Sequence, residues 1–232
     1  MRKQHKRKIT KRTQRERQEK LKKRVKQGLI ILGILMVVCI GIKIRHPGWL
    51  SNKYWEMQNE KVDASQPELD VQLLTVNPYS RPGTETNKIR GIVVHYVANP
   101  GSTAQENRDY FEGLKDTHVT QASSNFIVGL DGEIIQCVPT WEVAYASNSR
   151  NIDTVSIECC HPDETGEFTN ETYRSLVQLC AWLCLKFDLD EEDVIRHYDV
   201  TGKNCPKYFV ENEKVFLQFR EDIHNAIENT EN

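Results

Sequence analysis

Three residues have side chains of the types that can bind zinc, and they stand where strand ends or loops are expected. His95 stands at the exit of a β-branched run, His197 follows a short apolar pair, and Cys205 comes eight residues later, behind a glycine-containing loop. Two imidazoles and one thiolate suit tetrahedral Zn²⁺, and the fourth position is left for water, as catalytic zinc requires. Such an ion lowers the pKa of its water to about 7 and polarises a carbonyl group. Spacing alone does not decide the matter, because an isolated histidine more often has a structural role.

Two charged residues could supply catalytic groups beside such an ion. Alternation along a strand puts Ser156 and Glu158 on one face of the segment VSIE. A carboxylate that ends an apolar strand is costly unless it is solvated, paired or functional, so Glu158 is a candidate general base. Lys203 stands two residues before Cys205 and could stabilise an oxyanion. The alternatives are a glutamate that points to solvent and a solvated loop lysine.

The elements that must position these residues alternate between strands and helices. Apolar, β-branched runs predict strands at 89–96, 126–130, 133–138, 154–160 and 194–195. Helices are expected at 102–114, where Ser102 and Gln105 have capping-box spacing, after Thr169, and at 212–228. The dipeptide Asp131-Gly132 is a strong hairpin signal. Strands interleaved with helices predict an α/β domain with a central mixed β-sheet flanked by helices, because the hairpin adds an antiparallel pair.

The N-terminal part of the chain differs in charge from the rest. Residues 1–27 carry fourteen Lys and Arg against two Glu, which leaves 17 basic and 31 acidic residues for the remainder. The net charge of -2 hides this asymmetry, which indicates that the two ends occupy different surroundings. A basic arm can bind nucleic acid, but its position beside an apolar run favours a role in topology and in contact with anionic lipid. We therefore predict no nucleic-acid partner.

An apolar run, GLIILGILMVVCIGIKI at residues 28–44, follows the basic arm. It is near the lower length limit for a transmembrane helix once Lys26 and Lys43 extend toward the headgroups. A cleaved signal peptide would need a small-residue cleavage site, which IKIRHPGWL lacks, and a buried core helix would show a polar face. We expect a single N-terminal transmembrane helix that acts as an uncleaved signal anchor, with the N-terminus in the cytoplasm. The resulting organisation is a basic cytoplasmic arm at 1–27, an anchor at 28–44, a stalk and docking segment at 45–82, and an exported folded domain at 83–232.

Seven cysteines would suggest disulfides in an exported protein, but their spacing is not that of a small disulfide-stapled fold. Cys39 lies in the apolar run. Cys180 and Cys184 fall on the apolar side of an expected helix, where a small hydrophobic side chain is a sufficient explanation. The cysteines leave the redox surroundings of the domain open.

Four segments occur in the order seen in type-2 N-acetylmuramoyl-L-alanine amidases: HYVANPGSTAQENRDYF, NFIVGLDGEIIQCVP, NIDTVSIECC and RHYDVTGKNCP. The chain resembles this family, which includes phage and bacterial endolysin amidases and is similar in fold to peptidoglycan recognition proteins. The resemblance covers residues 88–208, and its most specific part is 197–206. It implies a central mixed sheet with a zinc site at the base of a groove.

The resemblance also implies roles for individual residues. The residues that match the family's functional positions are the zinc ligands His95, His197 and Cys205 and the catalytic Glu158 and Lys203. The implied substrate is peptidoglycan, at the amide between the lactyl group of N-acetylmuramic acid and L-alanine of the stem peptide. Residues 83–232 would then be a zinc amidase domain that faces the cell wall from the cell membrane. The sequence indicates no protein partner.

One position departs from the family pattern. Many relatives carry histidine where this chain has Asn125, in the segment SSNF. An amide can donate or accept a hydrogen bond but cannot shuttle a proton near neutral pH. If that histidine assists catalysis, the asparagine lowers the rate without changing the type of reaction.

Other histidines and aromatic residues have less specific interpretations. His118 lies in the polar segment DTHVTQASS and His161 precedes Pro162, so we expect both to be exposed loop residues and not ligands. Trp141, Tyr145 and Arg150 lie in or beside the segment WEVAYASNSRN. They could bind stem peptide or sugar beside a groove, and a packing role fits them equally well.

Three other functions compete with hydrolysis by a zinc site. A non-catalytic peptidoglycan-binding module on the same fold would typically lack the third ligand, so Cys205 argues against it. A Cys-His peptidase would need a thiol of low pKa, ideally at a helix N-terminus, whereas Cys205 stands in an expected loop. A structural wall-binding protein would carry a separate binding repeat, and the sequence shows no internal repeat.

Overall fold

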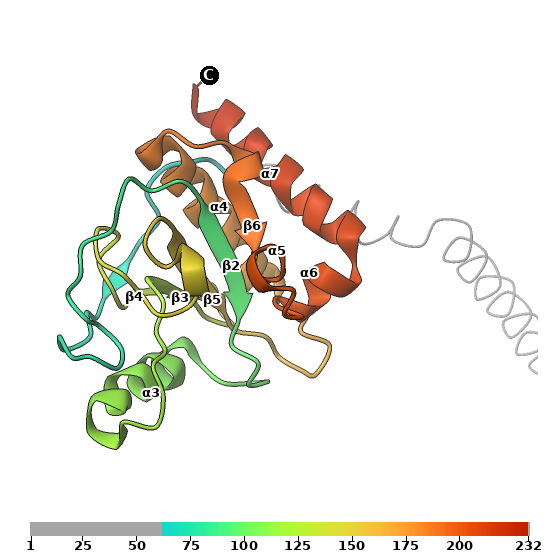
Figure 1. Ribbon diagram of the computed structural model, residues 1–232. Helices are drawn as coiled ribbons and strands as arrows, with labels where there is room; N and C mark the ends of the chain where they lie inside the picture. The colour runs from blue at the N-terminus through green and yellow to red at the C-terminus, as the bar shows by residue number, and fades with distance from the viewer. Residues whose placement is uncertain (1–61, 232) are drawn as a thin grey trace, which may run out of the picture. The chain divides into compact units, whose positions relative to one another are not determined.

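The computed structural model describes residues 62–231, which form a six-stranded mixed sheet with helices around it (Figure 1). The strands are β1 (Asp70–Val71), β2 (Ile92–Tyr96), β3 (Phe126–Val128), β4 (Ile134–Gln136), β5 (Val155–Cys159) and β6 (Val194–Arg196). Their order across the sheet is β1-β4-β3-β5-β2-β6. Within these residues β3 and β4 pair antiparallel and the other neighbours pair parallel. The predicted α/β class and mixed sheet are confirmed.

Five helices of the described residues surround this sheet. They are α3 (Ala104–Thr117), α4 (Asn170–Phe187), α5 (His197–Thr201), α6 (Lys207–Glu211) and α7 (Glu213–Glu231), with single 3₁₀ turns η1 (Asn148–Arg150) and η2 (Glu191–Asp193). The long helices α4 and α7 pack against each other, and α4 lies behind the sheet in Figure 1. The Thr169 hydroxyl caps α4 by accepting a hydrogen bond from Thr172 N, as predicted.

Both faces of the sheet are covered. Ile127 of β3 packs with Phe111 and Leu114 of α3 in one hydrophobic cluster. Its neighbours Phe126 and Val128 point to the opposite face by strand alternation, and both are fully buried. Burial on both faces explains why the central strands are mainly apolar; the exceptions in β2 and β5 include His95 and Glu158, which belong to the site described below.

The predicted basic arm at 1–27, the predicted anchor at 28–44 and residues 45–61 of the predicted stalk lie outside the described residues. Among residues 62–231, no helix combines the length and the apolar character that crossing a bilayer requires. The anchor therefore stays a prediction from the sequence.

The described part of the docking segment, residues 62–82, packs on the folded domain. β1 pairs with β4, and Leu74 is buried with its N–H donating to Cys137 O at 2.9 Å. Further along, the Arg81 guanidinium meets both carboxylate oxygens of Glu142, at 2.7 and 2.8 Å. The compact unit therefore already includes residues that precede 83.

Two local features differ from the expectation. The capping box of α3 is formed by Thr103 and Glu106, one residue later than predicted, because the Ser102 hydroxyl instead donates to Asn99 O at 2.7 Å. The hairpin is present, but β3 and β4 are joined by residues 129–133, a longer loop than the two-residue turn that Asp131-Gly132 suggested. Gly132 has a φ of +84°, which a residue with a side chain rarely adopts.

All six cysteines of the described residues are free thiols, and all are buried: Cys137, Cys159, Cys160, Cys180, Cys184 and Cys205. Burial raises the pKa of the Cys137 and Cys184 thiols to about 12. Within residues 62–231 no disulfide contributes to the fold, which is held together by packing, hydrogen bonds and ion pairs.

Candidate metal centre

The first part of the site comes from two adjacent parallel strands. His95 of β2 and Glu158 of β5 are direct partners in the strand register, so their side chains leave the same face of the sheet. Each lies one residue before the carboxyl end of its strand. The carboxyl ends of parallel strands are where α/β folds place their binding sites.

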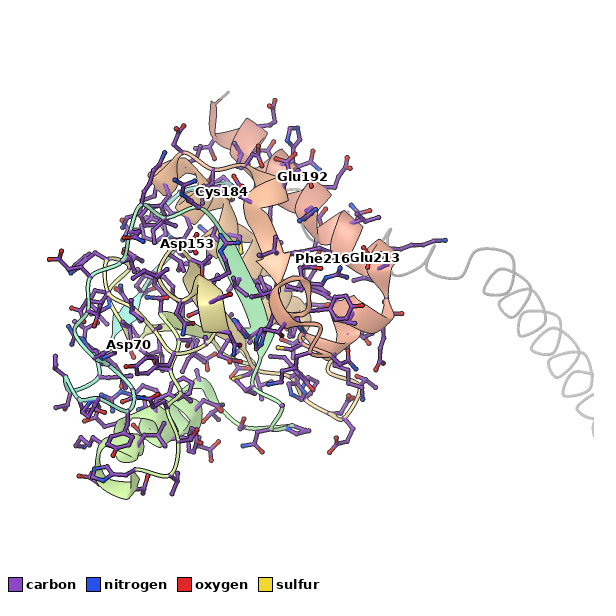
Figure 2. All side chains as sticks on the ribbon, in the orientation of Figure 1. Asp70, Asp153, Cys184, Glu192, Glu213 and Phe216 are labelled. Carbon is purple, nitrogen blue, oxygen red and sulfur yellow. The ribbon has the colours of Figure 1, made fainter. Side chains whose placement is uncertain are left out.

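His197 enters from the third parallel strand of this group. β6 pairs with β2 and ends at Arg196, and His197 begins α5 immediately afterwards. The Arg196 guanidinium is buried, donates to Glu213 of α7 at 2.5 Å and lies 4.4 Å over the Phe216 ring. Figure 2 labels Glu213 and Phe216 on α7. This contact joins the start of α5 to the long C-terminal helix and fixes the position of His197.

Cys205 returns to the site on the loop that follows α5. Gly202 ends the helix in the left-handed region, with a φ of +77°, and reverses the chain direction. The loop is held back against the helix because Tyr198 N donates to Cys205 O at 2.9 Å. Cys205 is 2% exposed, so its thiol faces the protein interior and not solvent.

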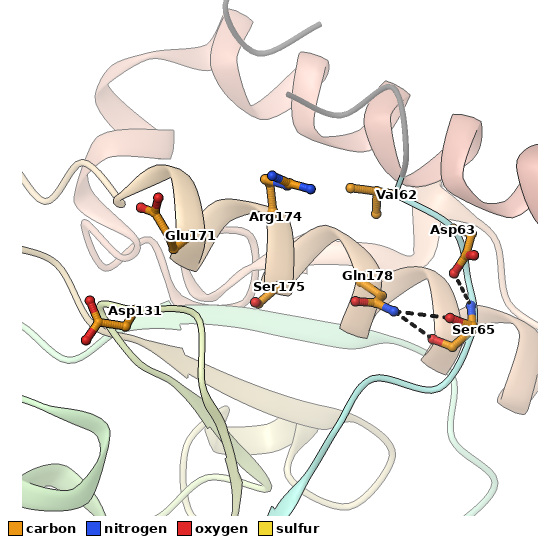
Figure 3. A pocket seen from close by; sticks show the side chains of 8 residues that line it. All are labelled: Val62, Asp63, Ser65, Asp131, Glu171, Arg174, Ser175 and Gln178. Carbon is orange, nitrogen blue, oxygen red and sulfur yellow. Dashed lines mark hydrogen bonds between the residues drawn. The ribbon is translucent and has the colours of Figure 1, made fainter. Parts of the chain in front are cut away.

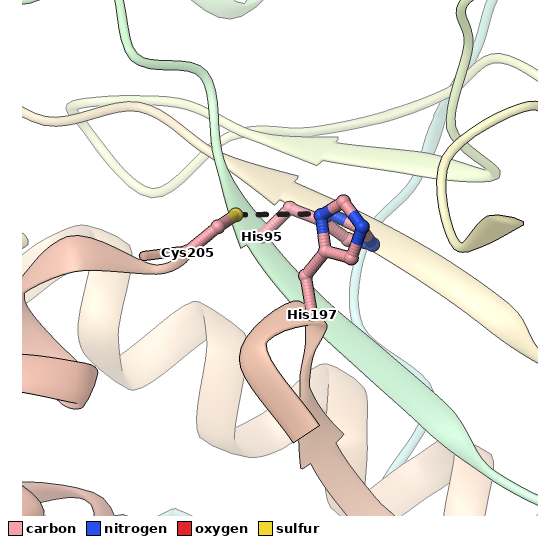
Figure 4. Close-up of side chains that lie close together, drawn as sticks. All are labelled: His95, His197 and Cys205. Carbon is pink, nitrogen blue, oxygen red and sulfur yellow. Dashed lines mark hydrogen bonds between the residues drawn. The ribbon is translucent and has the colours of Figure 1, made fainter. Parts of the chain in front are cut away.

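The three predicted ligands converge. His95, His197 and Cys205 each offer one ligand atom, and these atoms lie within 4.8 Å of one another (Figure 4). The Cys205 Sγ to His95 Nδ1 distance is 3.8 Å. Two ligand atoms on one tetrahedral zinc lie about 3.4–3.6 Å apart, as the zinc–nitrogen and zinc–sulfur bond lengths require. The arrangement is thus close to the spacing that a single ion needs.

The outer nitrogens of both imidazoles have partners on one segment. His95 Nε2 lies 3.1 Å from Ser147 Oγ, and His197 Nε2 lies 3.0 Å from Asn148 Oδ1. The inner nitrogen of His197, Nδ1, is buried and has no hydrogen-bond partner within the described residues. A buried nitrogen without a partner is costly unless something binds it. The sequence interpretation missed Ser147 and Asn148, because no local spacing links them to the histidines.

The electrostatics of the cluster favour neutral imidazoles. Burial lowers the pKa of His95 well below its usual value of 6.5, and His197 and Lys203 lower it further. Burial and the Lys203 charge also lower the pKa of His197. Burial raises the pKa of the Cys205 thiol to about 12, and Glu158 adds to the rise. Neutral imidazoles can ligate a cation directly, whereas the thiol needs a cation beside it to ionise.

Glu158 is not the solvent-exposed glutamate of the alternative interpretation. Its Oε2 is buried and lacks a hydrogen-bond partner within the described residues. Burial raises the pKa of this carboxyl to about 8, while the Lys203 ammonium opposes the rise. Lys203 itself is exposed, on the loop between α5 and Cys205. A buried carboxyl with a pKa raised toward neutrality is suited to accept a proton.

Asn125, the position that the sequence analysis singled out as a departure, is a buried structural residue. Its Oδ1 accepts hydrogen bonds from Ser156 N at 2.9 Å and from Ser156 Oγ at 3.1 Å. Its Nδ2 donates to Pro139 O at 3.0 Å. The amide therefore ties β5 to the turn after β4, and these bonds occupy both of its ends.

We expect Asn125→Ala to lower the free energy of unfolding by about 1–3 kcal/mol, because it removes the acceptor of the buried Ser156 N–H and leaves Pro139 O with Glu142 N as its remaining donor. Asn125→His should not raise the turnover number, since an imidazole cannot make the same bonds. Denaturant midpoints and turnover measured against the exposed control Asn87→Ala check both points. An unchanged midpoint for Asn125→Ala would show that the amide is dispensable.

The structure separates the two remaining histidines. His118 is exposed and stacks on Tyr79, with ring centroids 4.2 Å apart, in agreement with the expectation. The expectation was wrong for His161, which is 1% exposed. It is buried because its ring packs 5.1 Å from that of Tyr96 and its Nδ1 lies 2.7 Å from Asp163 O. Neither histidine belongs to the ligand group.

The aromatic segment after the hairpin remains partly exposed. Trp141 is 64% exposed, whereas the Arg150 Nε is 2.7 Å from the Asp153 carboxylate. A separate hollow of about 380 Å³ lies along α4 (Figure 3). Its lining is polar apart from Val62 and consists of Val62, Asp63, Ser65, Asp131, Glu171, Arg174, Ser175 and Gln178. None of the predicted site residues lines this hollow.

The sequence matches a known protein family and several of its members. The family model described as N-acetylmuramoyl-L-alanine amidase matches residues 85–208, a range that contains all five predicted site residues. The N-acetylmuramoyl-L-alanine amidase CwlL of Bacillus licheniformis is 32% identical over 166 residues, which are 66% of this chain and 46% of that protein. The amidase BlyA of Bacillus subtilis strain 168 is 32% identical over 171 residues, 65% of this chain and 45% of that protein. The chain thus spans about half the length of these curated relatives.

Solved structures share the fold. The structure of PlyL has a TM-score of 0.58 and 21% identity, and the match covers 68% of this chain and 97% of PlyL. The catalytic domain of XlyA has a TM-score of 0.58 and 23% identity, with 68% of this chain and 99% of that domain covered. At this level of identity the similarity shows the arrangement of strands and helices.

Proposed function

The chain belongs to the N-acetylmuramoyl-L-alanine amidase family, and we propose that it is a zinc-dependent hydrolase of peptidoglycan. The bond that it would cleave is the amide between the lactyl group of N-acetylmuramic acid and L-alanine of the stem peptide. The observation that carries this proposal is the convergence of His95, His197 and Cys205, whose ligand atoms lie within 4.8 Å, next to the buried carboxyl of Glu158.

The donor set fits zinc. Two imidazoles and one thiol are ligands that zinc prefers, and three of them leave a position for substrate or water. The buried, unpartnered Nδ1 of His197 supplies a lone pair where an ion would lie, because the Nε2 of the same ring faces the Asn148 amide oxygen. A calcium or magnesium ion would instead be surrounded by oxygen ligands.

The residues around this position would divide the chemistry between them. Zinc held there would lower the pKa of a water to about 7 and polarise the lactyl carbonyl. Glu158 would take a proton from the attacking water and return it to the alanine nitrogen as the carbon–nitrogen bond breaks. Lys203, whose charge acts on both histidines and on Glu158, would stabilise the oxyanion. The products would be a free lactyl carboxylate and a stem peptide with a free L-alanine amine.

Digestion of purified peptidoglycan by the full-length chain tests this proposal. We expect mass spectrometry to find stem peptides that begin at L-alanine, elemental analysis to find about one zinc per chain, and a chelator to stop release until Zn²⁺ is restored. Zinc without peptide release would favour a non-catalytic peptidoglycan-binding module. A chain without zinc would contradict the ligand assignment.

We further propose that the catalytic domain is held outside the cytoplasm by the segment at 28–44. The charge asymmetry of the sequence and the apolar run support this proposal. The chain should stay with membranes that have been washed in alkaline carbonate, and external protease should reach the domain in cells stripped of their wall. Recovery of the intact chain in the wash would contradict anchoring by this segment.

A further inference from the structure

One short loop contacts both histidines of the candidate metal centre. Residues 145–151 run between β4 and β5, and they include the 3₁₀ turn η1. Ser147 Oγ lies 3.1 Å from His95 Nε2, and the neighbouring Asn148 Oδ1 lies 3.0 Å from His197 Nε2. The two histidines come from β2 and α5, which are about a hundred residues apart in the sequence, so this loop is a common partner of two distant elements.

The contact with Asn148 selects which nitrogen of the His197 ring carries the proton and which faces inward with its lone pair. An amide oxygen can only accept a hydrogen bond, so Asn148 requires the proton of His197 to be on Nε2. The lone pair of His197 is then on Nδ1, the buried atom that has no partner within the described residues. The contacts of His95 are compatible with the same tautomer, because its Nδ1 faces Cys205 Sγ and its Nε2 can donate to the serine hydroxyl.

The loop is itself fixed by hydrogen bonds. Asn151 Oδ1 accepts from both Ala146 N and Ser147 N, at 3.1 and 2.5 Å. Tyr145 N donates to Ser123 Oγ at 2.9 Å, and Ser123 N donates to Tyr145 O at 3.1 Å. Ser147 is fully buried. Both ends of the loop are therefore held before any ligand binds.

We propose that Ser147 and Asn148 are positioning residues that hold both imidazoles so that each binds the metal through Nδ1. This inference rests on the zinc site proposed above, and it adds two residues to the three ligands. Groups that hold the outer nitrogen of a metal-binding histidine fix its tautomer and orientation, and their removal typically weakens metal binding about 10–100-fold. The buried Ser147 should contribute more than Asn148, which is exposed and in competition with water.

The backbone of Asn148 guides the choice of variants. Its φ is +52°, in the left-handed region that asparagine and glycine tolerate best. Asn148→Gly therefore removes the amide oxygen without adding backbone strain, and Asn148→Asp keeps an acceptor oxygen at the same place. Ser147→Ala removes the buried hydroxyl. Ser149→Ala makes the same change two residues along the loop, at an exposed position, and is the matched control.

The test measures metal binding by the full-length chain. Zinc affinity is determined by competition with a chromophoric chelator, and Co²⁺ is added separately so that its absorption spectrum reports the ligand geometry. We expect Ser147→Ala and Asn148→Gly each to weaken zinc binding at least about 10-fold and to alter the Co²⁺ spectrum. Asn148→Asp should restore binding to within about threefold of the unsubstituted chain, and Ser149→Ala should leave binding unchanged.

The outcomes separate this inference from the function on which it rests. If the unsubstituted chain binds no zinc, the metal site itself is wrong and the positioning role falls with it. If it binds zinc, and Asn148→Gly and Ser147→Ala bind with the same affinity and spectrum, the positioning role is wrong while the amidase proposal stands. If Ser147→Ala fails to fold, Asn148→Gly alone decides. The Asn148 side chain is exposed, so its removal leaves the core intact.

Discussion

Replacement of Cys205 with serine is expected to abolish zinc binding and amide hydrolysis together. The thiol is one of three ligand atoms within 4.8 Å, and a neutral hydroxyl is a poor substitute for a thiolate on zinc. The stabilisation of developing charge that zinc provides amounts to several kcal/mol, so kcat/KM should fall by about 10³-fold or more. Elemental analysis and release of stem peptides from peptidoglycan, measured on the same preparation, check the two losses.

The matched control is Cys180→Ala, which removes another buried thiol, from the interior of α4. It should cost some stability while zinc content and turnover stay the same. Full zinc content in Cys205→Ser with turnover lost would point to a cysteine nucleophile instead of a ligand. That alternative already faces a physical obstacle, because burial raises the pKa of this thiol to about 12 and a nucleophile needs the thiolate.

The second large effect is expected at Glu158. Glu158→Gln keeps the shape of the side chain but removes the group that would accept a proton, so turnover should fall by about 10²–10⁴-fold. Zinc binding should be retained, because the glutamate is not among the three ligand atoms. The variant should also be at least as stable as the unsubstituted chain, since it replaces a buried carboxyl whose Oε2 lacks a partner within the described residues.

Turnover, zinc content and denaturant midpoint distinguish this role from a structural one. Glu221→Gln, an exposed glutamate of α7, is the control for the change of charge. A loss of zinc in Glu158→Gln would make the carboxylate a ligand or a support for one. Turnover within tenfold of the unsubstituted chain would remove Glu158 from the mechanism and leave the zinc site without its base.

Two members of the ligand group could be predicted from their places at strand ends, because His95 stands near the end of β2 and His197 directly after β6. A β-branched run marked β2 and a short apolar pair marked β6, and parallel strands place their carboxyl ends at one edge. This arrangement puts His95 and His197 at the same edge of the sheet, and the pairing of β2 with β6 in the structure makes them neighbours. Donor chemistry had already singled out Cys205 and strand alternation Glu158, and the resemblance to amidases implied the same residues.

The partners of these residues could not be predicted in the same way. Ser147 is 52 residues from His95 and Asn148 is 49 residues from His197, so no helical or strand period connects them. Serine and asparagine are also common in loops, where they form turns as readily as they support a metal site. His161 was predicted to be exposed because it precedes a proline, which is typical of a loop. The structure shows that it is buried, with its ring packed against that of Tyr96.

The free, buried thiols of residues 62–231 allow local unfolding of this domain to be measured by alkylation. An alkylating reagent reacts only with thiolates that it can reach, so each buried cysteine stays unmodified until the chain around it opens. The alkylation rate of Cys137 would then report how often the β1–β4 edge opens, and that of Cys180 how often α4 separates from the domain. The alkylation rate of Cys205 would report opening of the loop after α5, and a bound metal ion should lower this rate. The rates at which the individual cysteines are alkylated would therefore report local unfolding separately in different parts of the fold.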